Sequence, residues 1–297
     1  MSQRHLVVAL NGRRRVTALR IVGNARINYE AYDIRRERTG VHARVNVLVN
    51  DVVAAWDRLN VEDGDQRVRL AGRAIKQFGA LAKDWPRQDL QIDLDDFCDQ
   101  LYPVWLSQYA PEPMAGAEER TAPTMLIEGM LLEGSGTIIF APPGRGKSYV
   151  ALIAAVSCEH GINQIFRIPQ PSHSLYVNLE RHAESMRRRL GNVNAALGLD
   201  RNTALPFLNA RGKGLSDIYE SIVQYVQENK VEVVFLDSIS RAGYAGSLTE
   251  DVTANRISDA LNGLGIAWVA IAHTPRADES HPFGSMMFEA AADIEIQ

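Results

Sequence analysis

One segment of the sequence carries glycine, lysine and serine at a spacing that suits the binding of phosphate. Residues 136–148 read GTIIFAPPGRGKS, in which a short apolar run leads into a turn rich in glycine and proline, and a helical stretch follows. Gly144 and Gly146 would let the backbone curl so that its N–H groups converge on phosphate oxygens, and the helix start adds partial positive charge there. This strand–loop–helix pattern predicts a Walker A phosphate-binding loop.

The loop also predicts its ligands, which are ATP and Mg2+. Lys147 is expected to reach the β- and γ-phosphates, and the hydroxyl of Ser148 is expected to ligate Mg2+. The stricter form of the motif begins with glycine, where this chain has Ala141, the smallest change available. A chance glycine-rich turn is the alternative, and the flanking strand and helix disfavour it. The residues expected to contact the nucleotide are Pro143, Gly144, Arg145, Gly146, Lys147, Ser148 and Tyr149.

Three polar residues end other apolar runs, at the edge where ligands bind in open α/β sheets. Asp237 ends VEVVFLD and is expected to hold Mg2+ together with Ser148. Glu180 ends SLYVNLE and is placed to orient an attacking water, and His273 ends IAWVAIAH. Each residue has a simpler explanation: an aspartate that closes a turn, an exposed glutamate, and a histidine with ordinary hydrogen bonds.

The order of these features resembles that of RecA and DnaB relatives. It is most similar to the RepA-type hexameric helicases of plasmids and phages and to their AAA-type relatives, over residues 124–297. The resemblance implies a RecA-like P-loop ATPase in which Glu180 is the catalytic base. It also implies that the strand of His273 lies between the P-loop strand and the strand of Asp237, so that His273 would sense the γ-phosphate.

The resemblance further implies a homo-oligomeric ring or filament that acts on single-stranded DNA. The family's arginine-finger position holds Phe283 here, which leaves Arg241 and Arg276 as candidates for DNA or intersubunit contacts, with solvated loop charges as the alternative. The first hypothesis is therefore a helicase-like ATPase of DNA replication or recombination. The second is an ATP-switched loader or scaffold that assembles with a protein partner, and the third is a nucleotide-binding module without catalysis.

The apolar runs also predict the domain organisation. Residues 124–297 alternate apolar strands with helices, which is typical of an α/β fold with a mostly parallel sheet covered on both faces. Residues 110–123 have a linker composition, and residues 1–109 are expected to form a small α+β accessory domain. The final segment corresponds to a core strand after which relatives continue, so either the domain is minimal or the natural protein extends further.

Within residues 1–109, strands are expected at residues 5–10, 16–22 and 42–50. Asn50-Asp51 is expected to cap a helix that carries Val52, Val53, Trp56 and Leu59 on one face. The acidic run at residues 93–99 is expected to be the solvated start of a further helix rather than a metal site.

Composition limits the class of protein. Hydrophobic residues make up 46% and charged residues 23% of the 297 residues, as in soluble globular proteins. No apolar run approaches the ~20 residues that a membrane helix needs, and no signal peptide is recognised. Cys98 and Cys158 lack partners at metal spacing, which favours buried thiols in a reducing cytoplasm.

The charge is unevenly distributed along the chain. Residues 1–45 hold ten arginines and three acidic residues, whereas residues 46–119 hold seven basic and fourteen acidic residues. The basic arm is suited to nucleic acid. Alternatively, the two segments form surfaces that pack on each other.

Overall fold

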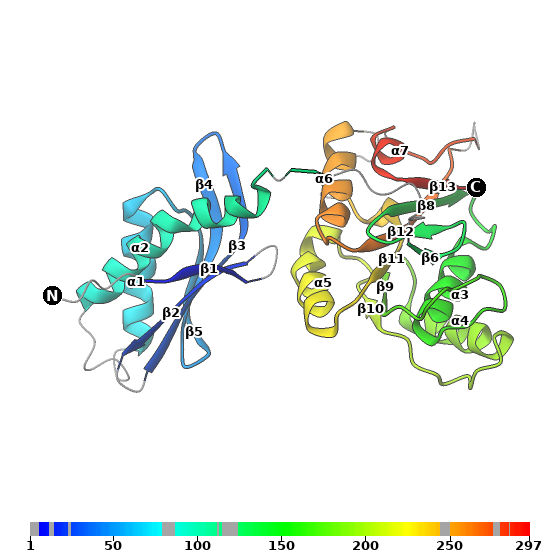
Figure 1. Ribbon diagram of the computed structural model, residues 1–297, viewed down its shortest axis with the longest axis horizontal. Helices are drawn as coiled ribbons and strands as arrows, with labels where there is room; N and C mark the ends of the chain where they lie inside the picture. The colour runs from blue at the N-terminus through cyan, green and yellow to red at the C-terminus, as the bar shows by residue number, and fades with distance from the viewer. Residues whose placement is uncertain are drawn as a thin grey trace. The chain divides into compact units, whose positions relative to one another are not determined.

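The computed structural model describes residues 6–11, 15–22, 25–78, 87–111, 113–114, 124–243, 250–275, 280–284 and 286–297. The chain folds into two compact units, Met1–Gly116 and Ala117–Gln297. Each unit has its own main sheet (Figure 1). The expected linker at residues 110–123 lies mostly outside the described residues.

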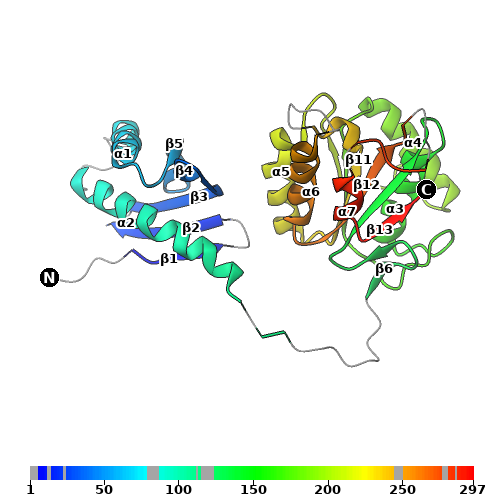
Figure 2. The ribbon, with the colours of Figure 1, turned by 90° about the horizontal axis from the view of Figure 1, so that it is seen from above.

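The first unit is a two-layer α+β structure, as the sequence predicts. Its five antiparallel strands lie in the order β1-β2-β3-β4-β5, and α2 runs across β1 to β3 (Figure 2). Alternation along β3 directs Ile27, Tyr29 and Ala31 into the core beneath the helices. The elements are β1 (Val8–Asn11), β2 (Arg15–Val22), β3 (Ala25–Glu37), β4 (Gly40–Val49), β5 (Val52–Asn60), α1 (Gly64–Phe78), α2 (Arg87–Leu106) and the 3-10 helix η1 (Ser107–Tyr109).

The prediction of a helix after Asn50-Asp51 is wrong, because this segment forms the strand β5. Asn50 and Asp51 both have positive φ angles, 50° and 65°, and form the two-residue turn of a hairpin in which Val49 pairs with Val52. Asparagine and aspartate favour hairpin turns as well as helix caps. The β-branched residues that follow, together with the neighbouring strand β4, favour the hairpin.

The acidic run is not a solvated helix start either. Helix α2 begins six residues before Asp93, and Asp93 is only 4% exposed. Arg20 of β2 donates from Nε to Oδ2 of Asp93 at 2.9 Å and from a second nitrogen to Oδ1. Arg67 of α1 contacts Asp95 and Asp99 at 3.4 and 2.8 Å. The acids therefore join α2 to other elements, and among the described residues no group suited to a metal ion is found.

The second unit has the predicted α/β fold, with a six-stranded sheet in the order β10-β9-β11-β12-β8-β13. All strand pairs of this six-stranded sheet are parallel. Helices α3 and α4 pack on one face, and α5 and α6 on the other. The strands are β8 (Gly136–Ala141), β9 (Ser174–Asn178), β10 (Phe207–Asn209), β11 (Val233–Asp237), β12 (Ala267–His273) and β13 (Ile294–Ile296). The helices are α3 (Lys147–His160), α4 (Ala183–Ala196), α5 (Leu215–Asn229), η2 (Ile239–Arg241), α6 (Asp251–Asn262) and α7 (Met287–Ala291).

The strand order brings the expected site residues to one edge. Strand β12 lies between β8 and β11, as the family resemblance implies, and His273 pairs with Ala141 where β8 enters the loop. Two features of the second unit were not predicted: the edge strand β10, and the ribbon of β6 (Met125–Ile127) and β7 (Leu131–Leu132). In the first unit, the strand β3 was not predicted. Within the described part of the chain, no helix has the length and apolar character needed to cross a membrane.

The buried pair of Arg20 and Asp93 leads to a stability prediction for the first unit. Arg20→Ala leaves a buried carboxylate unpaired and should destabilise this unit by about 3–5 kcal/mol. The measurement is urea unfolding of the full chain followed by hydrogen exchange in peptides of this unit.

The matched control is Arg73→Ala, because Arg73 pairs with Asp57 at a half-exposed site. It should cost no more than about 1 kcal/mol. Equal losses for the two arginines would show that the buried pair has no special role.

Candidate functional site

The loop between β8 and α3 has the backbone geometry that phosphate binding requires. Gly144 and Gly146 have φ angles of 82° and 90°, in the left-handed region that favours glycine. A Cβ atom at either position would meet no heavy atom within 4 Å, so conformation rather than space requires glycine here. Helix α3 begins directly after Gly146, which places the amides of its first turn at the loop.

Lys147 lies in the loop with its side chain turned back to the strand end. It is 7% exposed, and its Nζ donates to the carbonyl oxygens of Ala141 and Pro142 at 2.5 and 2.9 Å. Burial lowers the pKa of Lys147, against the opposing effect of the nearby Glu180 and Asp237. Lys147 bonds to the backbone carbonyl of Ala141 and not to its side chain. The alanine at the motif's first glycine position therefore leaves this hydrogen bond intact.

Asp237 ends β11 in a buried position, with 1% exposure. Its Oδ2 accepts a hydrogen bond of 2.9 Å from the hydroxyl of Tyr176, which the sequence did not indicate as a site residue. Its Oδ1 is buried and has no hydrogen-bond partner among the described residues. Burial raises the pKa of Asp237, while Ser148 and Tyr176 lower it.

The orphaned oxygen is an argument for a metal ligand. A buried carboxylate oxygen without a partner is costly unless something else satisfies it. Asp237 and the Ser148 hydroxyl line the same pocket, and both are the hard oxygen donors that Mg2+ prefers. The residues present therefore fit a magnesium ion.

Glu180 follows β9 and contacts residues from two other strand ends. The hydroxyl of Ser238 donates to its Oε2 at 3.1 Å, and Nε2 of His273 lies 3.7 Å from the same oxygen. His273 and Ser238 lower the pKa of Glu180 to about 2, against the raising effect of burial. Glu180 is thus ionised at neutral pH and is a weak base, which suits it to orienting a water molecule by hydrogen bonding.

These residues surround one cavity of about 110 Å³. It is smaller than the pockets that usually hold a whole small-molecule ligand, which are about 300–1,000 Å³. The lining residues are Gly144, Gly146, Lys147, Ser148, Tyr149, Glu180, Arg181, Arg189, Asp237, Ile271 and His273.

Two arginines in this lining were missed by the sequence analysis. Arg181 directly follows Glu180, and its Nε is buried without a hydrogen-bond partner among the described residues. The guanidinium of Arg189 lies 4.6 Å from the ring centroid of Tyr149, within cation–π range. The sequence offers a signal for Arg181, which directly follows an acidic residue at a strand end. It offers none for Arg189, because the last of three consecutive arginines on a helix would be expected to face solvent.

The remaining expected residues do not line the cavity. Pro143 and Arg145 are exposed in the loop, and Arg241 is exposed at the end of η2, which follows β11. Arg276 lies outside the described residues. The backbone N–H of Phe283 donates to the carbonyl of His273 at 2.5 Å, so the segment that carries the expected finger position contacts the strand of His273.

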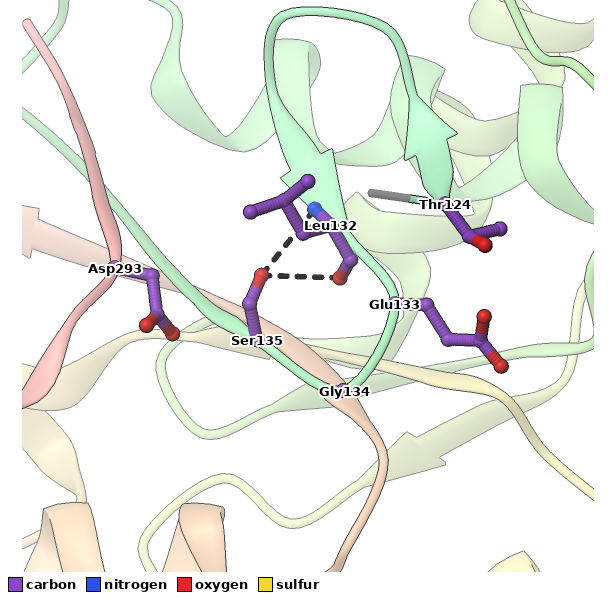
Figure 3. A pocket seen from close by; sticks show the side chains of 6 residues that line it. All are labelled: Thr124, Leu132, Glu133, Gly134, Ser135 and Asp293. Atoms are coloured by element: carbon purple, nitrogen blue, oxygen red, sulfur yellow. Dashed lines mark hydrogen bonds between the residues drawn. The ribbon is translucent and has the colours of Figure 1, made fainter. Parts of the chain in front are cut away.

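A larger hollow of about 450 Å³ lies at the opposite end of β8 and offers no comparable chemistry. Oδ2 of Asp293 accepts from the backbone N–H of Gly136 at 2.8 Å, and the hydroxyl of Ser135 is bonded to the backbone of Leu132 (Figure 3). These polar groups are satisfied within the fold. The hollow is therefore explained by the way β13 closes onto β8.

Comparison with known proteins gives the family of the chain. The AAA domain family matches residues 107–279, which is more than half of the chain. The chain belongs to the AAA domain family. With β12 between the strand of the phosphate-binding loop and the strand of Asp237, this AAA protein has the predicted RecA-like P-loop ATPase core.

A solved structure that is similar to this AAA protein is a KaiC-like protein from the hyperthermophilic archaeon Pyrococcus horikoshii. The similarity covers 58% of this chain and 76% of that chain at 17% identity, with a TM-score of 0.39. Comparison with curated proteins gives no match.

The buried charge of Asp237 predicts a trade-off between stability and ligand binding. A carboxylate whose folded pKa is raised lowers stability at neutral pH, and this cost disappears as the pH falls through the folded pKa. Asp237→Asn should therefore raise the melting temperature of the ligand-free protein at pH 7. A gain of about 1 kcal/mol corresponds to roughly 2–4 °C, and differential scanning calorimetry from pH 7 downward should show the difference shrinking.

The control for this measurement is Asp259→Asn, at an exposed position on α6. It should leave the melting temperature within about 1 °C of the original, as surface changes usually do. A lower melting temperature for Asp237→Asn at pH 7 would mean that neighbouring groups stabilise the charge more than burial disfavours it.

Proposed function

We propose that this protein hydrolyses ATP with Mg2+ and uses the cycle to act on single-stranded DNA as a homo-oligomer, in the manner of a helicase-like replication or recombination ATPase. The observation that carries the ATPase part is the buried Oδ1 of Asp237, which has no hydrogen-bond partner among the described residues and lies in a pocket that also contains Lys147 and Ser148. A cation bound at that oxygen would balance the negative charge of Asp237, and a phosphate bound at the loop would balance the positive charge of Lys147.

Binding is assigned to the loop and the two strand ends. The loop amides and the amine of Lys147 hold the phosphates, and Lys147 exchanges its carbonyl partners for phosphate oxygens when they arrive. Ser148 and Asp237 hold Mg2+, which supplies charge neutralisation on the β- and γ-phosphates when bound. Tyr176 donates to Oδ2 of Asp237 and so orients the carboxylate, which would leave Oδ1 available to a metal ion.

Glu180 is assigned to the attacking water. Its carboxylate is held by Ser238 beside His273, and its low pKa keeps it ionised so that it accepts a hydrogen bond from water. As the water oxygen bonds to the γ-phosphorus, the bond from that phosphorus to the β–γ bridging oxygen breaks and ADP leaves. The attacking water becomes more acidic as this happens, so that a weak base can accept its proton. His273 contacts Glu180, and its strand continues into the segment near Phe283, so His273 would report phosphate loss to that segment.

The DNA part rests on charge and on position. The first 45 residues carry a surplus of seven positive charges, ten arginines against three acids. Arg241 is exposed after β11, at the edge of the sheet that holds the site. A RepA-type helicase is the finer form of this proposal, and a loader or scaffold that assembles with a protein partner is its alternative.

Phosphate release measured with and without single-stranded DNA tests the proposal. Lys147→Ala should reduce turnover to background, because the phosphates lose their buried cation. Glu180→Gln should lower kcat by about 10²–10⁴-fold with little change in the KM for ATP, since it removes a group that acts on water rather than on nucleotide.

Lys213→Ala is the matched control, because Lys213 is exposed outside the pocket, and its turnover should be unchanged. If DNA neither binds nor stimulates turnover at low salt, the helicase-like function is wrong. Stimulation by a protein partner without a response to DNA would favour the loader or scaffold.

A further inference from the structure

The sheet of the first unit has two different faces. Helices α1 and α2 cover the face that carries residues such as Tyr29 and Ala31. The opposite face is covered by no described element of this unit. At one end of it lie six polar and aromatic residues that we call the sheet platform: Arg15 of β2, Tyr32 of β3, Arg44 and Asn46 of β4, and Trp56 and Arg58 of β5.

The platform is a stack of rings and guanidinium groups. The guanidinium of Arg44 lies 4.3 Å from the ring centroid of Trp56 and 5.3 Å from that of Tyr32. Arg15 lies 6.0 Å from the same tyrosine ring, on its other neighbouring strand. Trp56 remains 50% exposed although it takes part in this stack. A large aromatic surface is therefore presented to solvent, and it is held in place by cation–π contacts.

The charges of the platform are concentrated in one row. Tyr32 is paired directly with Arg44 across β3 and β4, and Arg44 with Arg58 across β4 and β5. Like charges at directly opposed positions destabilise a sheet unless an anion lies between them. Arg58 has a carboxylate, Asp33, at 3.4 Å, but this pair is at the exposed edge of the row.

The acidic residues near the row lie beside it or at its edge. Glu30 lies two residues before Tyr32 on β3, and its carboxylate is 4.0 Å from Arg15, a long ion-pair distance. The row itself contains three arginines and a tyrosine and no carboxylate. Such a surface is complementary to a ligand that is both anionic and aromatic.

We propose that the sheet platform binds single-stranded DNA, with bases stacked on Trp56 and Tyr32 and phosphates held by Arg15, Arg44 and Arg58. Unpaired bases stack on aromatic side chains while the backbone follows positive charge. Duplex DNA is a poorer ligand because its bases are already stacked on each other. This inference rests on the DNA substrate of the proposed function and assigns it a site outside the ATPase unit.

The test is fluorescence anisotropy of a labelled thymidine 20-mer with the full chain, in Mg2+ without nucleotide, at low salt. Trp56→Ala and Arg44→Ala should each weaken binding by about tenfold or more. Trp56→Phe should retain most of the affinity, since it keeps a ring for stacking. An abasic oligonucleotide of equal length should bind more weakly than the 20-mer and should be insensitive to Trp56→Ala.

The matched control is Arg73→Ala, which removes an arginine that pairs with Asp57 under the helix-covered face. It should change affinity by less than about twofold, as expected for a charge away from the binding surface. Circular dichroism of each variant checks that the sheet is folded. Basal phosphate release should be unchanged in Trp56→Ala, whose residue lies outside the nucleotide pocket.

The outcomes separate this inference from the proposed function. Wild-type DNA binding that persists in Trp56→Ala and Arg44→Ala overturns the platform and leaves the proposed function intact. Platform-dependent binding without phosphate release supports the platform and refutes the motor. No binding by the wild type overturns the platform, and dimerisation or partner-protein binding that is lost in the same variants would assign the face to protein instead.

Discussion

The structure depends on holding opposite charges close to a phosphate-binding loop without pairing them directly. Lys147 is held by carbonyl oxygens and Asp237 by a tyrosine hydroxyl, so neither uses the other as its partner. Burial disfavours the charged form of each, which is why the pKa of the lysine is lowered and that of the aspartate is raised. In the proposed function, this cost to the ligand-free protein is relieved when a phosphate and a magnesium ion bind together.

The parallel sheet supplies the rigidity that such a site needs. The carboxyl ends of β8, β9, β11 and β12 meet at one edge, and two apolar cores on opposite faces fix the strands. Because the groups proposed to bind phosphate, hold the metal and orient water come from different strands, no single segment could position them. The AAA domain family matches residues 107–279, a range that includes all four of these strands.

In the first unit, the two faces of one sheet carry different kinds of side chain. Its core is smaller and contains an arginine–aspartate pair that ties α2 to the sheet. One sheet face is used for that core, which leaves the other face to carry arginine and aromatic side chains. The arginines of this unit therefore fall into two groups. Some form ion pairs with the acidic residues of α2, and others lie together on the opposite face of the sheet.

By itself the sequence determined the loop, the strand ends and the family of folds, because these follow from local patterns: glycines that permit left-handed φ angles, and short apolar runs that end in a polar residue. It could not determine that residues 52–60 form a strand, because Asn50-Asp51 suits a helix cap as well as a hairpin and only pairing with β4 decides between them. The hydrogen bond from Tyr176 to Asp237 spans 61 positions, and the pairing of Arg20 with Asp93 spans 73. Contacts at such separations leave no periodic signal, so only the tertiary structure could decide them.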